Sequence, residues 1–331
     1  ISWQLPAWQE NLAITHWKRR GDGWICEQGN TCNLETGLEA TYQAMTLGLR
    51  DYVNKNGFPG IILGMSGGID SALSAAVAVD ALGSNRVHCV MMPSPYTSEE
   101  SLEDAAAAAN MLGVKIDTVP IGPAMNAFDE MLLDYFKGSE TGITEENIQS
   151  RSRALTLMAL SNKLGAMVLS TGNKSEMSVG YATLYGDMCG GYSVLKDVYK
   201  MTVFELSKWR NKFRPNGALG PEGAVMPERI ISKPPSAELK PDQKDEDTLP
   251  PYEELDAILH GLIEDEANVQ EIASRGFDID VVMRIWQMLD RAEYKRRQAP
   301  PGVKIGHRAF GRDRRYPITN SYKASYQINN N

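Results

Sequence analysis

Short apolar runs alternate along the chain with longer stretches whose apolar residues recur at helical spacing. The run at residues 61–65 suits a strand that is buried on both faces of a sheet. The stretch before it, residues 34–54, repeats apolar side chains every three to four positions, and the alanine-rich stretch after it, residues 71–82, ends at Gly83. The pattern therefore predicts a helix, a buried strand and a second helix in this order.

The same alternation continues downstream. Further strands are expected at residues 87–92, 114–119 and 166–170, and further helices at residues 98–112, 125–136, 145–164, 252–263 and 281–297. Strands separated by helices of about a dozen residues pair in parallel through right-handed crossovers. We therefore predict an α/β fold: a doubly wound, Rossmann-like, mostly parallel sheet with helices on both faces, followed by C-terminal helices. Ligands of such sheets bind at the carboxyl ends of the strands.

Three segments lack this pattern. Residues 216–251, here named the lid loop, are rich in proline and charge and have no periodicity, so we expect a long mobile loop that covers a site or merely connects two helices. Residues 1–33 contain short strand-like pieces at 12–17 and 23–26, which suit the end of a β-rich domain or a linker. The basic and then Asn-rich end, residues 299–331, is expected to fray.

Composition narrows the classes of function. The formal net charge of −8 does not favour a nucleic-acid partner. No apolar run approaches the roughly 18 residues that a membrane span requires. The cysteines Cys26, Cys32, Cys89 and Cys189 form no CxxC pair, so we expect reduced thiols in a cytoplasmic protein rather than a disulfide framework or a zinc site.

The most informative motif is Ser66-Gly67-Gly68-Ile69-Asp70-Ser71, which lies between the expected strand and helix. Glycines let the backbone approach a ligand closely, and the N-terminus of the following helix offers unpaired N–H groups to an anion. The hydroxyls of Ser66 and Ser71 add donors. A carboxylate such as Asp70 needs a metal ion between itself and a phosphate, and Mg²⁺ suits that chemistry.

Two other known motifs resemble parts of this sequence. The Walker loop has no match, since Gly172-Asn173-Lys174-Ser175 shares only its last letters. The G-x-S-x-G nucleophile elbow does match residues 64–68, so a serine hydrolase that uses Ser66 is an alternative. That reading explains neither Asp70 nor Ser71. A non-catalytic nucleotide-binding module is a third hypothesis.

The hexapeptide resembles the pyrophosphatase loop of the ATP pyrophosphatase superfamily, whose members cleave ATP between its α- and β-phosphates. Later blocks resemble NAD synthetases of the glutamine-dependent branch, in the order found in that family. These blocks lie at residues 146–151, 170–176, 185–187, 195–200 and 233–239, the last of which is followed by Asp245, Asp247 and Tyr252. Together they place the resemblance over residues 36–303.

The resemblance implies roles for individual residues. Those expected to bind ATP are Gly64, Met65, Ser66, Gly67, Gly68, Ile69, Asp70, Ser71, Thr171 and Lys200. Asp70 and Glu176 are expected to be catalytic and to hold Mg²⁺. From the residues alone, Glu176 could equally be a first-turn helix carboxylate, Thr171 a helix N-cap and Lys200 a solvated side chain.

The resemblance also implies a second substrate, deamido-NAD, with Asn147, Arg151, Glu176 and Lys295 as its contacts. Asn147 and Arg151 are four residues apart and share a helix face, which could also be merely an exposed polar face. The chain departs from the ammonia-dependent branch at Leu184, where that branch has a lysine, and at Tyr294, where it has a histidine.

The implied organisation has three parts. Residues 1–33 resemble the tail or linker of a preceding nitrilase-like amidase domain, whose own catalytic residues would precede Ile1. Residues 34–303 resemble the synthetase domain, and residues 304–331 form a C-terminal tail. The implied reaction is adenylation of deamido-NAD by ATP and its amidation by ammonia, which the amidase domain releases from glutamine. The family further implies a homodimer or a larger homo-oligomer.

Overall fold

A parallel sheet forms the centre of the molecule. The computed structural model describes residues 1–241 and 243–319, and in this part of the chain five strands pair in parallel in the order β5-β4-β3-β6-β7. The strands are β3 (Ile61–Gly64), β4 (Val87–Met91), β5 (Lys115–Thr118), β6 (Met167–Ser170) and β7 (Tyr192–Ser193). The order proceeds outwards in opposite directions from β3 and β6, so the predicted doubly wound α/β fold is confirmed.

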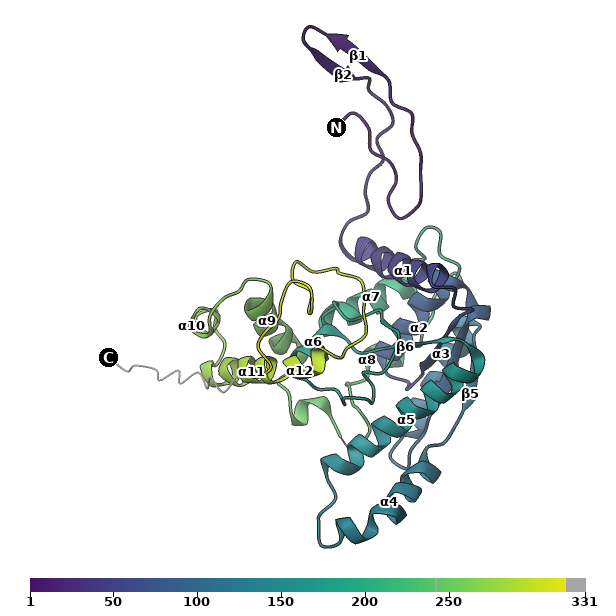
Figure 1. The fold of residues 1–331 in the computed structure, drawn as a ribbon, viewed down its shortest axis with the longest axis vertical. Helices are drawn as coiled ribbons and strands as arrows, with labels where there is room; N and C mark the ends of the chain where they lie inside the picture. Colours follow the sequence, from purple (N-terminus) through teal and green to yellow (C-terminus); the bar gives the residue numbers. More distant parts are fainter. Residues whose placement is uncertain (242, 320–331) are drawn as a thin grey trace, which may run out of the picture.

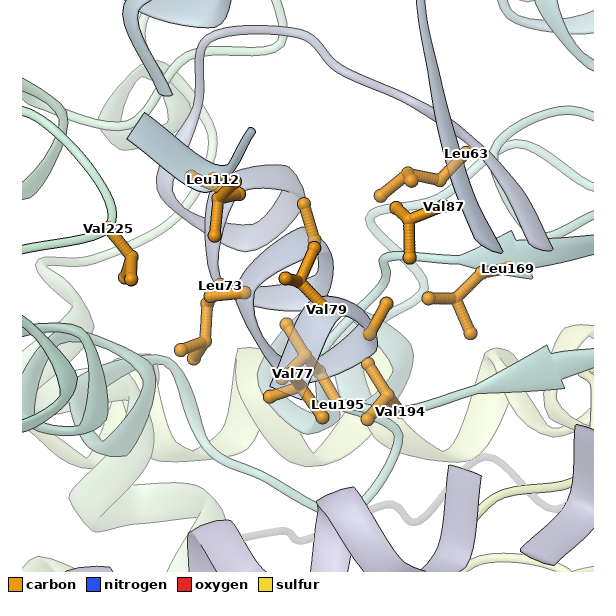
Figure 2. Close-up of a cluster of buried hydrophobic side chains, with 14 of the residues drawn as sticks. Leu63, Leu73, Val77, Val79, Val87, Leu112, Leu169, Val194, Leu195 and Val225 are labelled. Atoms are coloured by element: carbon orange, nitrogen blue, oxygen red, sulfur yellow. The ribbon is translucent and has the colours of Figure 1, made fainter. Parts of the chain in front are cut away.

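Helices cover both faces of this sheet because the strand residues alternate between two apolar cores. Leu63 and Cys89 belong to the larger core. It is packed by α1 (Gly37–Lys55), α2 (Ile69–Leu82), α3 (Glu99–Leu112) and α7 (Lys200–Lys212). Figure 2 shows the strand side chains of this core beside α2. Ile62 and Val90 belong to the opposite core, which α4 (Gly122–Phe136) and α5 (Ile143–Leu164) cover.

A second group of helices lies beside the sheet (Figure 1). Its members are α6 (Lys174–Val179), α9 (Tyr252–Ile263), α10 (Val269–Ala273), α11 (Ile279–Arg291) and α12 (Glu293–Arg296). They enclose an apolar core of their own, to which Leu255, Ile258 and Ile285 contribute. The helix predicted over residues 281–297 is thus two helices, which are separated at Ala292. Strand β7 and helices α6, α7 and α10 were not predicted.

The lid loop contains more structure than its sequence predicts. It includes a helix, α8 (Glu228–Ser232), and a 3-10 turn, η2 (Asp245–Asp247). Ile230 and Ile231 of α8 are buried in the larger core. The expectation of a loop without any regular structure was wrong for these residues, because two adjacent apolar side chains suffice to anchor one helical turn.

The ends of the chain differ from each other. Strands β1 (Trp17–Arg20) and β2 (Gly23–Cys26) form an antiparallel hairpin that stands away from the body in Figure 1. The expected strand at residues 12–17 is therefore displaced to β1. Another 3-10 turn, η1 (Ser84–Arg86), precedes β4. Near the other end, Val303, Ile305 and Phe310 pack against the two cores, so this part does not fray as expected. The remaining tail, residues 320–331, lies outside the described residues.

Among the helices of the described residues, none has the length and apolar character needed to cross a bilayer.

Candidate active site

The loop between β3 and α2 forms one wall of the site. Gly67 has φ +83°, and a Cβ atom there would lie 2.2 Å from the carbonyl oxygen of Ser101, so only glycine fits. The N–H of Gly68 donates to Ser66 Oγ at 3.2 Å, and Ser71 Oγ donates to the Gly68 carbonyl at 2.9 Å. These bonds fix a tight turn. Helix α2 then begins at Ile69 without a side-chain cap, so its first N–H groups remain available to a ligand.

Two carboxylates and one ammonium group face each other across this wall. Lys200 Nζ lies 2.5 Å from Asp70 Oδ2 and 3.1 Å from Glu176 Oε1. Asn173 holds both acids from the other side: its Nδ2 donates to Asp70 Oδ1 at 2.8 Å, and its backbone N–H donates to Glu176 Oε2 at 3.5 Å. The three segments after β3, after β6 and at the start of α7 therefore meet at one point.

The predicted site residues after β6 have definite structural places. Asn173, not Thr171, is the N-cap of α6, and Glu176 completes a capping box with it. Glu176 is therefore both a first-turn helix carboxylate and a partner of Lys200. Lys200 is no solvated lysine, because its side chain is only 3% exposed.

Burial and neighbouring charges shift the pKa values of Glu176 and Lys200. Burial raises the pKa of Glu176 to about 8, and Asp70 and Asp245 add repulsion, while Lys200 opposes the change. Burial by itself would lower the pKa of Lys200, but Asp70 and Glu176 outweigh it and raise that pKa. Lys200 thus keeps its charge, and a cation bound beside Glu176 would favour the ionised form of that acid and lower its pKa again.

A buried network of hydrogen bonds positions Glu176 and Lys200 relative to each other. Asp256 of α9 accepts hydrogen bonds from Ser175 Oγ at 2.5 Å and from the Met201 N–H at 2.8 Å. Ser175 Oγ in turn accepts the N–H of Lys200 at 2.9 Å. The N-terminal turns of α6 and α7 are therefore held together through one carboxylate of the second helix group.

The lid loop covers the same space. Glu238 accepts hydrogen bonds from the hydroxyls of Ser98 at 2.9 Å and Ser101 at 2.7 Å, at the N-terminus of α3. Asp245 is 4% exposed; its Oδ2 accepts the Tyr252 hydroxyl at 2.8 Å, and its Oδ1 has no hydrogen-bond partner among the residues that the structure describes. A buried carboxylate oxygen without a partner is unusual in proteins.

These parts enclose a cavity of about 310 Å³. The residues expected to bind ATP all line it, namely Gly64, Met65, Ser66, Gly67, Gly68, Ile69, Asp70, Ser71, Thr171 and Lys200, as does Glu176. Met91, Met92 and Pro93 at the end of β4 line it as well. The cavity lies where the strand order reverses between β3 and β6, which is where doubly wound sheets bind ligands.

The other predicted substrate residues gather elsewhere, around the segment after α6. Asn147 Oδ1 accepts the Thr183 hydroxyl at 3.0 Å, and Arg151 Nε donates to the Leu184 carbonyl at 3.3 Å. Lys295 Nζ donates to the carbonyls of Gly180 at 2.8 Å and Ala182 at 2.6 Å. These three side chains do not line the cavity but converge on residues 180–184 beside it. Burial lowers the pKa of Lys295.

Sequence reasoning missed several cavity residues. Arg153, whose Nε donates to the Met92 carbonyl at 3.1 Å, lines the cavity, and burial lowers its pKa. Lys233, Asp187 and Asp245 line it too. Asp187 and Asp245 belong to the segments that resemble the NAD synthetase family, so this resemblance could have indicated them as cavity residues. Arg153 lies two residues beyond the first block, and only the turn of α5 brings it to the cavity.

The serine hydrolase alternative finds no support in this geometry. The hydrogen bonds of Ser66 Oγ involve Ser71 Oγ and the Gly68 N–H. His88 instead pairs with Asp117 at 2.7 Å, and His260 lies 3.4 Å from Asp265. Within the described residues, no histidine forms a hydrogen bond with Ser66, as a base that activates it would.

The carboxylates of Asp70 and Glu176 suit a Mg²⁺ ion that takes only a few of its ligands from the protein. Within the described ranges, no group of three or more His, Cys, Asp or Glu side chains is arranged to hold a metal ion. Asp70 and Glu176 nevertheless direct one oxygen each at a single cation, Lys200 Nζ. Mg²⁺ bound with phosphates commonly takes only one or two carboxylates and fills its other positions with phosphate oxygens and water. The two residues therefore fit that ion.

Comparison with known proteins identifies the family. The family model described as NAD synthase matches residues 41–299. The chain is 49% identical over 323 residues to the glutamine-dependent NAD(+) synthetase of Rhodobacter capsulatus, covering 98% of this chain and 58% of that protein. It is 52% identical over 282 residues to the protein of the same name from Acinetobacter baylyi, covering 85% of this chain and 51% of that protein.

A solved structure agrees with these matches. The glutamine-dependent NAD+ synthetase of Acinetobacter baumannii in complex with ADP is 47% identical, with a TM-score of 0.59, over 90% of this chain and 53% of that one. The chain thus spans about half the length of the relatives it matches. From the family model and these identities, the chain belongs to the NAD synthase family.

Proposed function

We propose that this chain is the synthetase part of a glutamine-dependent NAD synthetase, which converts deamido-NAD, ATP and ammonia into NAD, AMP and pyrophosphate. The observation that carries the proposal is the meeting of the Ser66–Ser71 turn with Asp70, Glu176 and Lys200 in one cavity at the switch point of the sheet. The names of the relatives supply the substrate class.

In the first step, a carboxylate oxygen of the nicotinate group attacks the α-phosphorus of ATP. A bond to the α-phosphorus forms, the bond to the bridging oxygen of the β-phosphate breaks, and pyrophosphate leaves. Negative charge builds on the departing group, so the free N–H groups of the turn and of the α2 N-terminus stabilise it. Lys200 adds a positive charge on the same side of the cavity.

Asp70 and Glu176 would hold the magnesium ion, and the ion would neutralise charge on the phosphates. Asn173 keeps both carboxylates oriented by its two hydrogen bonds. No side chain needs to act as a nucleophile, because positioning and charge stabilisation lower the barrier of such transfers.

In the second step, ammonia attacks the carbonyl carbon of the adenylate and AMP leaves. Asn147, Arg151 and Lys295 would bind deamido-NAD around residues 180–184, with Glu176 at the end nearest the phosphates. The lid loop would exclude water, which otherwise hydrolyses the adenylate. Its place over the cavity, through Glu238 and Asp245, supports this role.

The proposal extends to the parts that the relatives have in addition. An amidase domain would precede residues 1–33 and supply ammonia from glutamine, consistent with relatives that are about twice as long. Residues 34–303 would be the synthetase domain and residues 304–331 its tail. A cytoplasmic homodimer or larger homo-oligomer completes the proposal.

The test is to measure pyrophosphate and NAD from ATP, Mg²⁺ and deamido-NAD, with ammonium in one reaction and glutamine in another. This chain should form both products with ammonium. Product from glutamine in addition would mean that an amidase half is present in the protein assayed. Absence of pyrophosphate in both reactions would contradict the synthetase, and binding of ATP without pyrophosphate would favour a nucleotide-binding module.

A further inference from the structure

The two carboxylates at the site each have one oxygen committed and one directed at Lys200. Asn173 occupies Asp70 Oδ1 at 2.8 Å and Glu176 Oε2 at 3.5 Å. The other oxygens, Asp70 Oδ2 and Glu176 Oε1, lie 2.5 and 3.1 Å from Lys200 Nζ. Lys200 therefore contacts the two oxygens that Asn173 leaves free.

An ammonium group and a divalent cation compete for these two oxygens. Mg²⁺ binds oxygen at about 2.0–2.1 Å, and Lys200 Nζ already lies at contact distance from both atoms. Two positive charges this close repel strongly in a partly buried site. The side chain of Lys200 is 3% exposed, so it cannot simply turn into water.

Lys200 can leave the pair only if another anion receives it. A buried charge that loses its partner is costly. Its further neighbours are the ring of Tyr252 at 5.1 Å and the carboxylate of Asp245, and each attracts it less than the Asp70–Glu176 pair does. The phosphates of a nucleotide, bound at the adjacent turn of residues 66–71, would supply the required negative charge.

We propose that Lys200 competes with divalent cations for Asp70 and Glu176, so that the pair takes up a metal ion only together with a nucleotide. This inference rests on the proposed function, because it needs the nucleotide phosphates to lie at the Ser66–Ser71 turn. Lys200 then couples the two ligands: the metal releases the ammonium group, and the phosphates receive it. Binding of either ligand favours binding of the other.

The experiment measures Mn²⁺ affinity by electron paramagnetic resonance of the free ion, with and without ADP, and needs no turnover. In Lys200→Gln the affinity for Mn²⁺ alone should rise roughly 5- to 150-fold, the usual range of coupling between sites. The ratio of the affinities with and without ADP should fall by a similar factor. Adding Asp70→Asn to this variant should remove the gain, which would place the bound ion at the pair.

Lys233→Gln is the matched control. It removes the same charge from the lining of the same cavity, but Lys233 binds Ser101 Oγ at 2.8 Å and not the carboxylate pair. The affinity of this variant for Mn²⁺ alone should stay within about twofold of that of the original protein, since Lys233 contacts Ser101 and Glu238 rather than the carboxylate pair. An equal gain in this control would overturn the inference, because the effect would then be a general one of charge.

A second variant guards against a folding defect in Lys200→Gln. Lys200→Arg keeps the positive charge and should keep the low affinity for Mn²⁺ alone; a gain there would also overturn the inference. So would a folded Lys200→Gln, judged by its thermal unfolding, whose affinity for Mn²⁺ alone is unchanged. A starting protein that binds neither ADP nor Mn²⁺ with ADP would instead contradict the proposed function.

Discussion

Asn173 orients the two carboxylates of the site. Its side chain and its backbone N–H hold one oxygen each of Asp70 and Glu176, so the free oxygens of both acids point the same way. The side chain of Asn173 also caps α6 by accepting the N–H of Glu176 at 2.9 Å. A single residue thus combines a helix cap with the orientation of two carboxylates from different helices, α2 and α6.

Asp70→Asn should therefore reduce turnover strongly while leaving the fold intact. The amide is similar in size but has no charge to offer a cation or Lys200. Loss of one such group typically costs roughly 10²- to 10³-fold in rate. Pyrophosphate release in the presence of Mg²⁺ is the measurement.

Asp117→Asn serves as the control for this change. Asp117 lies on β5 at the edge of the sheet, where it pairs with Lys115 of the same strand and with His88 of β4. The rate of pyrophosphate release by Asp117→Asn should remain near that of the original protein. Near-normal turnover in Asp70→Asn would remove Asp70 from the mechanism.

Asp256 makes stability depend on pH in an unusual direction. Burial raises its pKa from 3.8 to about 6, against the hydrogen bonds from Met201 and Ser175. Between these two values the folded protein binds more protons than the unfolded chain, so the free energy of unfolding falls as pH rises from about 4 to 7. Two pH units correspond to about 3 kcal/mol.

Asp256→Asn should lack this contribution. Urea unfolding should be measured at several pH values. Between pH 4 and pH 7, the free energy of unfolding of the variant should rise relative to that of the original protein by up to about 3 kcal/mol. The difference between the two proteins is the useful quantity, because all other titrating groups cancel in it. Parallel profiles would mean that the carboxyl keeps its ordinary pKa.

At the scale of the element, Glu238 is one of the lid-loop side chains that hold the loop at α3, together with Arg229 and Lys233. Glu238 accepts from the hydroxyls of Ser98 and Ser101 and takes φ +48° to reach them. Hydrogen bonds to a charged acceptor contribute about 1.5–3 kcal/mol each. Glu238→Ala should thus speed amide hydrogen exchange in residues 233–239 by roughly tenfold or more.

Glu246→Ala is the comparison for this change, since Glu246 belongs to the same loop and is exposed. It should leave exchange in the lid loop unaltered. Equal protection in Glu238→Ala and the original protein would show that packing of α8, rather than Glu238, holds the loop.

The elements also show what the sequence can and cannot predict. Strand β3 and helix α2 were predicted because a buried parallel strand and an alanine-rich helix leave strong local patterns. Strand β7 has two residues, and its pairing with β6 depends on the tertiary fold alone. The turn at residues 66–71 was evident for the same local reason. The unpartnered oxygen of Asp245 and the approach of Arg153 were not, because both depend on contacts between distant segments.

At the scale of the molecule, one buried lysine joins three parts of the chain. Lys174 is fully buried and pairs with Asp197 at 2.7 Å and Glu264 at 2.6 Å. It also donates to the carbonyl of Arg308 at 3.0 Å, so the segment near the C-terminus is tied to α6 and α9. The second helix group is thus linked to the sheet at α6, the helix that also carries Glu176.

The two groups of predicted ligand contacts are spatially separate, and this leads to a prediction about specificity. Arg151 lies beside Leu184 and outside the cavity, whereas Lys200 and the Ser66–Ser71 turn line it. Arg151→Ala should therefore raise KM for deamido-NAD by about tenfold or more, since a lost charged hydrogen bond costs about 1.5–3 kcal/mol. The affinity for ADP should stay unchanged. Steady-state kinetics and ADP titration separate these effects, and an equal loss of both would mean that Arg151 shapes the cavity itself through the segment at residues 180–184.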